Sequence, residues 1–198
     1  MWIVKLGGSL IADPLLPQWL ALLSQLGGGR VTIVCGGGRF ADEVRRVQAH
    51  WQFDDLAAHN MAVLAMAQTT WMVHGLQPSI ELASSEADVR RVLHGGRVAA
   101  WLPFDWLRGQ ATEYTNWGLT SDSIALDLAR LLNAERLVLV KSCDIDRSRS
   151  LDQLGETGVV DTRFAAGARG VAFPIDLVHR QELATMRALL IGEVGAIG

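Results

Sequence analysis

Short apolar runs alternate with longer stretches of mixed polarity along this chain. The runs over 2–6, 30–35, 97–102 and 137–140 are apolar enough to form strands that are covered on both faces of a sheet. Between these runs, apolar residues recur every three or four positions, which predicts helices over 15–26, 41–50, 54–73, 86–93 and 124–132. This succession of elements predicts a three-layer α/β/α sandwich around a mainly parallel central sheet.

The pattern weakens toward the C-terminus. Residues 146–157 are polar and lack apolar periodicity, so we expect a mobile loop there, followed by irregular chain over 158–170. Apolar residues return over 171–178, which predicts an edge strand whose pairing Pro174 would limit, and over 181–191, which predicts a terminal helix. The smaller expected elements are a short strand over 80–83, an exposed loop over 107–117 and a last strand within 192–198.

Composition limits the class of protein and its partners. With 198 residues, 49% hydrophobic and 20% charged, the chain fits one folded domain over 1–198. A net charge of −3 gives no basic footprint for nucleic acid, and no apolar run is long enough to predict a membrane span. Cys35 and Cys143 are too far apart in the sequence for a disulfide framework or a metal motif, and no signal-peptide pattern precedes the first strand. We therefore expect a cytoplasmic protein with no structural or catalytic metal ligands.

Two glycine-rich turns follow the first two predicted strands. Lys5 at the end of the first strand precedes Gly7, Gly8 and Ser9, and the second strand runs into the turn Gly36-Gly37-Gly38-Arg39. Glycines let an anion approach main-chain N–H groups, and a helix that starts after such a turn adds a partial positive charge. Each turn alone fits an ordinary tight βα connection. Two of them at neighbouring strand ends favour a phosphate site.

An acid and a second lysine complete the candidate site. Asp122 lies in the first turn of the helix that Thr120 or Ser121 would cap, and Lys141 ends the last central strand, before Ser142 and Asp144. Two lysines that approach a transferring phosphoryl group, with an aspartate that holds both ammonium groups, suit phosphoryl transfer. The simpler alternatives are an acid that complements a helix dipole and a solvated lysine after a strand.

These motifs resemble the amino acid kinase family over roughly residues 1–144. Lys5 to Ser9 match the family's opening lysine–glycine–glycine stretch, and Asp122 and Lys141 match its organising aspartate and ATP-side lysine. The resemblance implies a three-layer fold, ATP and Mg²⁺ as cofactors, a small-molecule acceptor and a homo-oligomer. It implies an acceptor side over roughly 1–115 and a nucleotide side over roughly 116–198. The implied catalytic residues are Lys5, Asp122 and Lys141, the implied phosphate and ATP-binding residues are Gly7, Gly8, Ser9, Ser142 and Asp144, and the implied acceptor-binding residues are Gly36, Gly37, Gly38, Arg39, Asn116 and Thr120.

One branch of the family is the most similar. Residues 59–66, 117–125 and 158–161 look most like the small branch of methanofuran biosynthesis, which phosphorylates an aminomethylfuran phosphate to its diphosphate. Isopentenyl phosphate kinases fit less well, because their histidine after the second glycine turn corresponds to Asp42 here. The chain also departs from the family where Ile145, rather than glycine, follows Asp144. A non-catalytic nucleotide-binding, anion-binding or storage protein, or a regulatory subunit, therefore remains an alternative.

Overall fold

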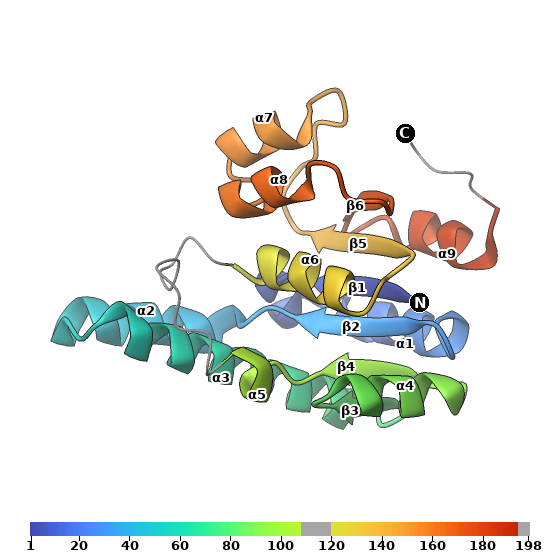
Figure 1. Cartoon of the computed structure of the whole chain (residues 1–198), viewed down its shortest axis with the longest axis horizontal. Coiled ribbons are helices and arrows are strands. Elements are labelled where there is room, and N and C mark those ends of the chain that lie inside the picture. Colours follow the sequence, from blue (N-terminus) through green and yellow to red (C-terminus); the bar gives the residue numbers. More distant parts are fainter. Residues whose placement is uncertain (108–119, 194–198) are drawn as a thin grey trace.

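The computed structural model describes residues 1–107 and 120–193, which build a six-stranded sheet between two helical layers (Figure 1). The strand order is β3-β4-β2-β1-β5-β6, and every ladder within it is parallel. The strands are β1 (Trp2–Leu6), β2 (Val31–Cys35), β3 (Ile80–Ala83), β4 (Val98–Trp101), β5 (Arg136–Lys141) and β6 (Ile175–His179). The predicted fold class is confirmed, with β1 in the interior of the sheet between β2 and β5.

Alternating side chains divide the core into two halves, one on each face of the sheet. Ile3, Leu137 and Leu139 belong to the cluster that holds the apolar residues of α4 (Glu86–His94) and α6 (Ser121–Leu131). Val4, Leu6 and Val138 belong to the opposite cluster, with α1 (Leu16–Leu26) and α9 (Leu183–Ile191). Because successive strand residues face opposite sides, any residue of β1 or β5 can be assigned to a layer by its position alone.

A helical hairpin extends the structure beyond the carboxyl ends of the strands. The helices α2 (Gly38–Trp51) and α3 (Asp55–Leu76) pack against each other and project past that edge of the sheet (Figure 1). Asp54 caps α3 by accepting a hydrogen bond from the N–H of Ala57 at 2.8 Å. A short helix, α5 (Phe104–Leu107), follows β4. The hairpin therefore flanks the edge of the sheet formed by the carboxyl ends of the strands, where the glycine turns lie.

Most predicted central elements are confirmed to within a few residues, but two C-terminal predictions are wrong. The helix α7 (Leu151–Glu156) lies within the stretch predicted as a loop, and α8 (Thr162–Ala168) lies within the stretch predicted as irregular. Both are too short to show a period, and both are started by local caps, the Ser150–Gln153 capping box and Asp161. Burial of Leu154, Phe164 and Ala165 in the core stabilises both helices.

The remaining differences lie at element ends. A 3-10 helix, η1 (Gly8–Ala12), begins inside the first glycine turn, and α2 starts at Gly38 rather than at Ala41. The predicted edge strand is confirmed as β6, which begins after Pro174, and the terminal helix begins at Leu183. The parts of the predicted 107–117 loop and 192–198 strand that fall on 108–119 and 194–198 lie outside the described residues. Within residues 1–107 and 120–193, the helices lack the length and apolarity that crossing a membrane requires.

Candidate active site

Parallel pairing and strand alternation bring Lys5 and Lys141 to the same place. In the β1–β5 ladder Leu6 is paired with Val140, so Lys5, just before the end of β1, and Lys141, at the end of β5, lie at the same edge of the sheet. Lys5 follows Ile3 by two residues and Lys141 follows Leu139 by two, so both lysines share the face that α6 covers. The sequence therefore directs two ammonium groups toward the first turn of one helix.

Asp122, in the first turn of α6, contacts both ammonium groups. Its Oδ1 lies 2.7 Å from Lys5 Nζ, and its Oδ2 accepts a hydrogen bond of 2.7 Å from Lys141 Nζ. The Lys5 ammonium group has three donors and makes one contact with Asp122, so it keeps donor capacity for another anion. The side chains of Lys5, Asp122 and Lys141 are 6%, 4% and 13% exposed, so screening of this triad by water is weak.

Burial and charge act against each other in this triad. Burial lowers the pKa of Lys5, and the neighbouring Asp122 carboxylate only partly offsets that effect. For Asp122, burial favours the neutral acid, but the ammonium groups of Lys5 and Lys141 together hold its pKa below the usual range. With all three groups ionised, two cations face one anion, and the excess positive charge has no further neutralising group within the triad. Such a site favours an anionic ligand.

Lys5 and Lys141 are the only lysines in the entire sequence. The other 16 of its 18 basic residues are arginines. A lysine ammonium is a compact point charge with three donors on a flexible stem, whereas a guanidinium is a wider, rigid planar group. That lysine occurs only at these two positions is a second indication of the site in the sequence, independent of the pattern of apolar residues in the strands.

A cleft of about 390 Å³ opens over the lysine pair. The predicted phosphate-binding residues Gly7, Gly8, Ser9 and Ser142 line it together with both lysines. Ser9 donates a hydrogen bond of 2.8 Å to Ser142 and so connects the turn after β1 to the turn after β5. Asp144 is exposed and does not line this cleft, although Cys143 directly before it does. We call this feature the lysine cleft.

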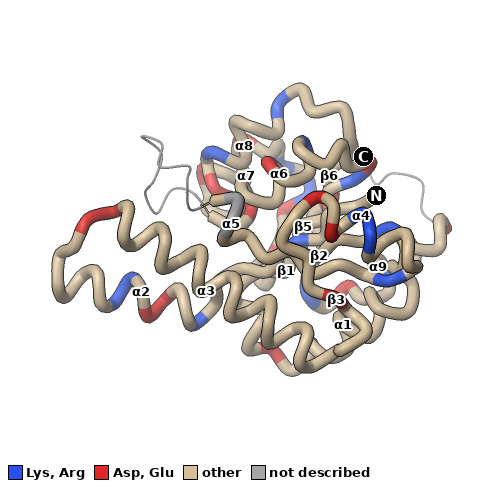
Figure 2. Tube along the Cα trace, turned by 60° about the horizontal axis from the view of Figure 1, so that its bottom comes forward, with Lys and Arg blue, Asp and Glu red and all other residues tan. Residues whose placement is uncertain are grey.

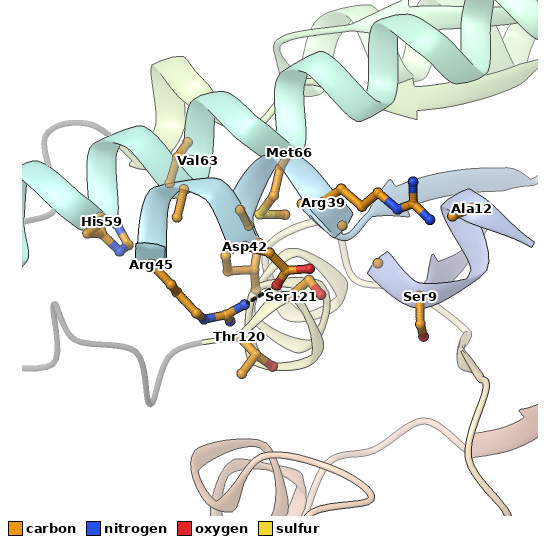
Figure 3. Close-up of a pocket in the computed structure, with 16 residues that line it drawn as sticks. Ser9, Ala12, Arg39, Asp42, Arg45, His59, Val63, Met66, Thr120 and Ser121 are labelled. Atoms are coloured by element: carbon orange, nitrogen blue, oxygen red, sulfur yellow. Dashed lines mark hydrogen bonds and ion pairs between the residues drawn. The ribbon is translucent and has the colours of Figure 1, made fainter. Parts of the chain in front are cut away.

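A second pocket of about 480 Å³ lies on the other side of η1, under the α2–α3 hairpin (Figure 3). The predicted acceptor-binding residues Gly37, Gly38, Arg39 and Thr120 line this hairpin pocket. Gly36 does not line it, and Asn116 lies outside the described residues. Gly8 and Ser9 belong to both the hairpin pocket and the lysine cleft, so the two spaces meet at η1.

The hairpin pocket also contains residues that the sequence alone did not identify as binding residues. Arg45 donates a hydrogen bond of 2.8 Å to Asp42, and the half-buried His59 has its pKa lowered by burial (Figure 3). Val63 and Met66, which follow His59 along α3, add apolar side chains to the same pocket. Asp42 and Arg45 lie about one and two helical turns after Gly38, so the sequence alone places both on one face of the helix that follows the second glycine turn. His59, by contrast, reaches the pocket only because α3 folds back along α2.

The two glycine turns need their glycines because they touch each other. A Cβ atom on Gly36 would lie 2.5 Å from the Gly8 nitrogen, and one on Gly8 would lie 2.6 Å from the Gly38 nitrogen. Gly38 also adopts a φ of +53°, which favours glycine. Backbone-to-backbone contact between the turns therefore sets the distance between the lysine cleft and the hairpin pocket. The glycines serve this contact as well as the approach of a ligand.

A parallel α/β sheet with a phosphate-sized cleft over two lysines and one aspartate defines a phosphoryl-transfer class of protein. Residues 1–146 match the model of the amino acid kinase family, and the chain belongs to that family and is a phosphotransferase by class. It is 28% identical over 146 residues to [5-(aminomethyl)furan-3-yl]methyl phosphate kinase of Methanocaldococcus jannaschii, a match that covers 73% of this chain and 67% of that protein.

Solved structures of two other kinases share the fold. The uridylate kinase of Archaeoglobus fulgidus superposes with a TM-score of 0.73 at 15% identity and covers 96% of this chain and 95% of its own. An isopentenyl phosphate kinase superposes with a TM-score of 0.62 at 16% identity and covers 97% and 96%. At these identities the similarity concerns the fold alone.

Proposed function

We propose that this protein transfers the γ-phosphoryl group of ATP to a small phosphate monoester of the aminomethylfuran phosphate type. The observation that carries the proposal is Asp122, which holds Lys5 and Lys141 together beneath a cleft that meets a second pocket. The chain is similar to a kinase that is named for that acceptor. The product of the reaction would be the corresponding diphosphate and ADP.

The proposed chemistry needs positioning and charge rather than a strong base. The second pKa of a phosphate monoester is about 6, so the attacking oxygen is already ionised at neutral pH. Charge spreads over the oxygens of the transferring group, and the two lysines of the cleft would neutralise it from two sides. Asp122 does not line the cleft and would keep both ammonium groups in place from behind.

The hairpin pocket has the chemistry for the proposed acceptor. Arg39, Arg45 and the N-terminus of α2 offer positive groups for the acceptor's phosphate, and Val63 and Met66 offer an apolar wall for a small ring. Among the described residues that line this pocket, Asp42 is the sole carboxylate. Its exposed pairing with Arg45 is a weak contact that a ligand ammonium group could replace.

ATP would lie across the lysine cleft toward β6. A further pocket of about 240 Å³, lined by apolar residues of α7, β6 and α9 and by Arg147 and Arg149, is large enough for part of a nucleotide. Within the described part of the chain no cluster of three or more acidic, histidine or cysteine side chains could hold a metal ion. Mg²⁺ usually binds through one or two carboxylates and the substrate phosphates, so it would arrive with ATP, and Asp144 is the nearby oxygen ligand.

The experiment measures ADP release and the diphosphate product from Mg-ATP and synthetic aminomethylfuran phosphate. The wild-type protein should form both products in equal amounts, and Lys5→Met should form neither while it remains folded. UMP and isopentenyl phosphate serve as competing acceptors. Failure to bind Mg-ATP at millimolar concentration in calorimetry would replace this proposal with the non-catalytic alternative. Turnover of UMP but not of the furan would retain the kinase and change its acceptor.

We also propose that the chain forms a homodimer through α3. The residues Ala57, Met61, Leu64, Gln68, Trp71 and Gly75 repeat at intervals of four and three and form an outer seam. Leu64 is 44% exposed and Trp71 is 59% exposed, although large apolar side chains are usually covered. The helix carries no Lys, Arg or Glu and has Asp55 as its single carboxylate (Figure 2). A second copy of the same seam would cover it without any charge conflict.

A further inference from the structure

Asp161 connects the C-terminal part of the chain to the first turn of α6. Its Oδ1 accepts hydrogen bonds from Ser123 Oγ at 2.5 Å and from the N–H of Phe164 at 2.6 Å. Its Oδ2 accepts hydrogen bonds from Thr120 Oγ1 and from the N–H of Ser123, the latter at 3.3 Å. The two carboxylate oxygens thus receive four donors, two of them hydroxyl groups on either side of Asp122 in the sequence.

The contact with Thr120 continues to Asp122. Thr120 Oγ1 donates to Asp161 and at the same time accepts a hydrogen bond of 3.2 Å from the N–H of Asp122. A threonine hydroxyl can rotate, so an acceptor for its proton fixes where its lone pairs point. Here the Asp161 carboxylate aims the lone pairs of Thr120 at the backbone of Asp122. Bonds in such a chain also polarise one another.

Asp161 therefore has two separable effects. It is the N-cap of α8, which any capping residue at this position would provide. It also fixes the backbone that carries Asp122, whose carboxylate must reach Lys5 and Lys141 at once. This support is needed because Asp122 lies in the first turn of α6. The backbone N–H groups there have no hydrogen-bond partner within the helix.

We propose that Asp161 is a positioning residue for phosphoryl transfer, which acts through Thr120 and Ser123 to keep Asp122 between the two lysines. This inference rests on the proposed function for its kinetic readout. Because misplacement of a reacting group by about 1 Å can cost about 100-fold in rate, Asp161→Ala should lower kcat by about 10-fold to 100-fold. The KM value for Mg-ATP should change little, because neither Asp161 nor Thr120 lines the lysine cleft.

The matched control is Asp54→Ala, which removes the N-cap carboxylate of α3 by the same substitution. Both variants should lose a similar amount of thermal stability, but only Asp161→Ala should lose kcat. Equal kcat in the two variants, corrected for the folded fraction, would reduce Asp161 to a cap and overturn the proposal. A large rise in the KM for Mg-ATP at unchanged kcat would overturn it as well, since a positioning effect on the triad lowers kcat and leaves that KM nearly unchanged.

A second readout needs no substrate. Because the chain has only two lysines, protein labelled with ¹⁵N in its lysine side chains should give two ammonium signals. These signals should shift in Thr120→Val, which keeps every charge, and stay in place in Thr120→Ser, which keeps the hydroxyl, and in Asp54→Ala. A shift in Asp161→Ala is also expected, but the lost Asp161 charge acts on Lys5 directly, so the Thr120 pair carries the test. If Asp161→Ala does not fold, the Thr120 pair decides alone. Unmoved signals in Thr120→Val would overturn the inference. Shifted signals in a protein that turns over no acceptor would retain it and reject the proposed function instead.

Discussion

At the scale of single residues, the site depends on the difference between lysine and arginine. Sixteen positions of this chain carry arginine, and the two that contact Asp122 carry lysine. Lys5 is a buried residue of β1 that still lines the lysine cleft, and it shares one carboxylate with Lys141, so a wider planar guanidinium would crowd this site. The identity of the cation, and not only its charge, is therefore set by the geometry.

Replacement of Lys5 by arginine should inactivate the protein although the charge is kept. We expect kcat to fall by about 100-fold to 1,000-fold, as when a preorganised donor to the transition state is removed. Steady-state ADP release measures the loss, and Arg90→Lys, which exchanges the two basic side chains at an exposed ion pair with Glu86 away from the pockets, is the control. A Lys5→Arg protein with near wild-type kcat would mean that the compact ammonium group is not needed.

Asp122→Asn should destabilise the fold and change how stability depends on pH. Removing one partner of a buried ion pair costs about 3–5 kcal/mol. The pKa of Asp122 is lower in the folded chain than its ordinary value of 3.8, so the unfolded chain binds more protons as the pH falls. The stabilisation is therefore complete above about pH 4 and is lost as the pH falls through the folded pKa.

Denaturant unfolding at several pH values tests this expectation. Between pH 7 and pH 2 the wild-type protein should lose more unfolding free energy than Asp122→Asn does. Asp42→Asn, which changes an exposed carboxylate on α2, should leave the pH dependence close to that of the wild type. Parallel curves for the wild type and Asp122→Asn would show that Asp122 is not ionised and paired in the folded state.

The residues of the triad could be predicted from the sequence because each sits at a strand end or in a first helical turn, where patterning fixes its place. Asp161 could not be predicted as a partner of α6. Its contacts span 38 and 41 residues, and they depend on how α7 and α8 pack, which no periodicity in that stretch encodes. The sequence raises His59, near the start of the helix predicted over 54–73, as a candidate to face a site, with a surface histidine as the alternative, but its pocket depends on the return path of α3.

At the scale of elements, the two glycine turns behave as one unit. Gly36→Ala should destabilise the fold by about 1–3 kcal/mol, because its Cβ meets backbone atoms of Gly8 that cannot move aside cheaply. Gly75→Ala is the control, because no atom lies within 4 Å of its added Cβ, and alanine in a helix should stabilise by about 0.5–1 kcal/mol. Thermal unfolding of both variants measures the difference. A Gly36→Ala protein as stable as the wild type would disprove the close contact.

Periodicity predicted the long elements well and the short ones poorly. Strands β1, β2, β4 and β5 are buried on both faces, so their residues are mostly apolar and the runs are easy to recognise. The helices α7 and α8 span six and seven residues, less than two turns each, and only their capping residues indicate them in the sequence. The seam of α3 was visible as apolar residues, but only the structure shows that the fold leaves it uncovered.

At the scale of the whole molecule, the outer seam of α3 should control assembly. Leu64→Glu places a charge at the centre of that seam and should convert a dimer to a monomer in sedimentation equilibrium. Leu131→Glu, an equally exposed leucine at the end of α6, should leave the mass unchanged. A wild-type monomer at micromolar concentration, or a Leu64→Glu dimer, would mean that α3 is not the interface.

The lysine pair has a practical consequence for covalent chemistry. Outside Lys5 and Lys141 the chain offers amine reagents only its N-terminus, which is paired with Glu135 at 3.1 Å. Thiol reagents meet a similar restriction, since Cys35 is buried with its pKa raised to about 12, whereas the exposed Cys143 lines the lysine cleft. Alkylation would therefore act at Cys143, so its rate becomes a probe of whether the lysine cleft is filled.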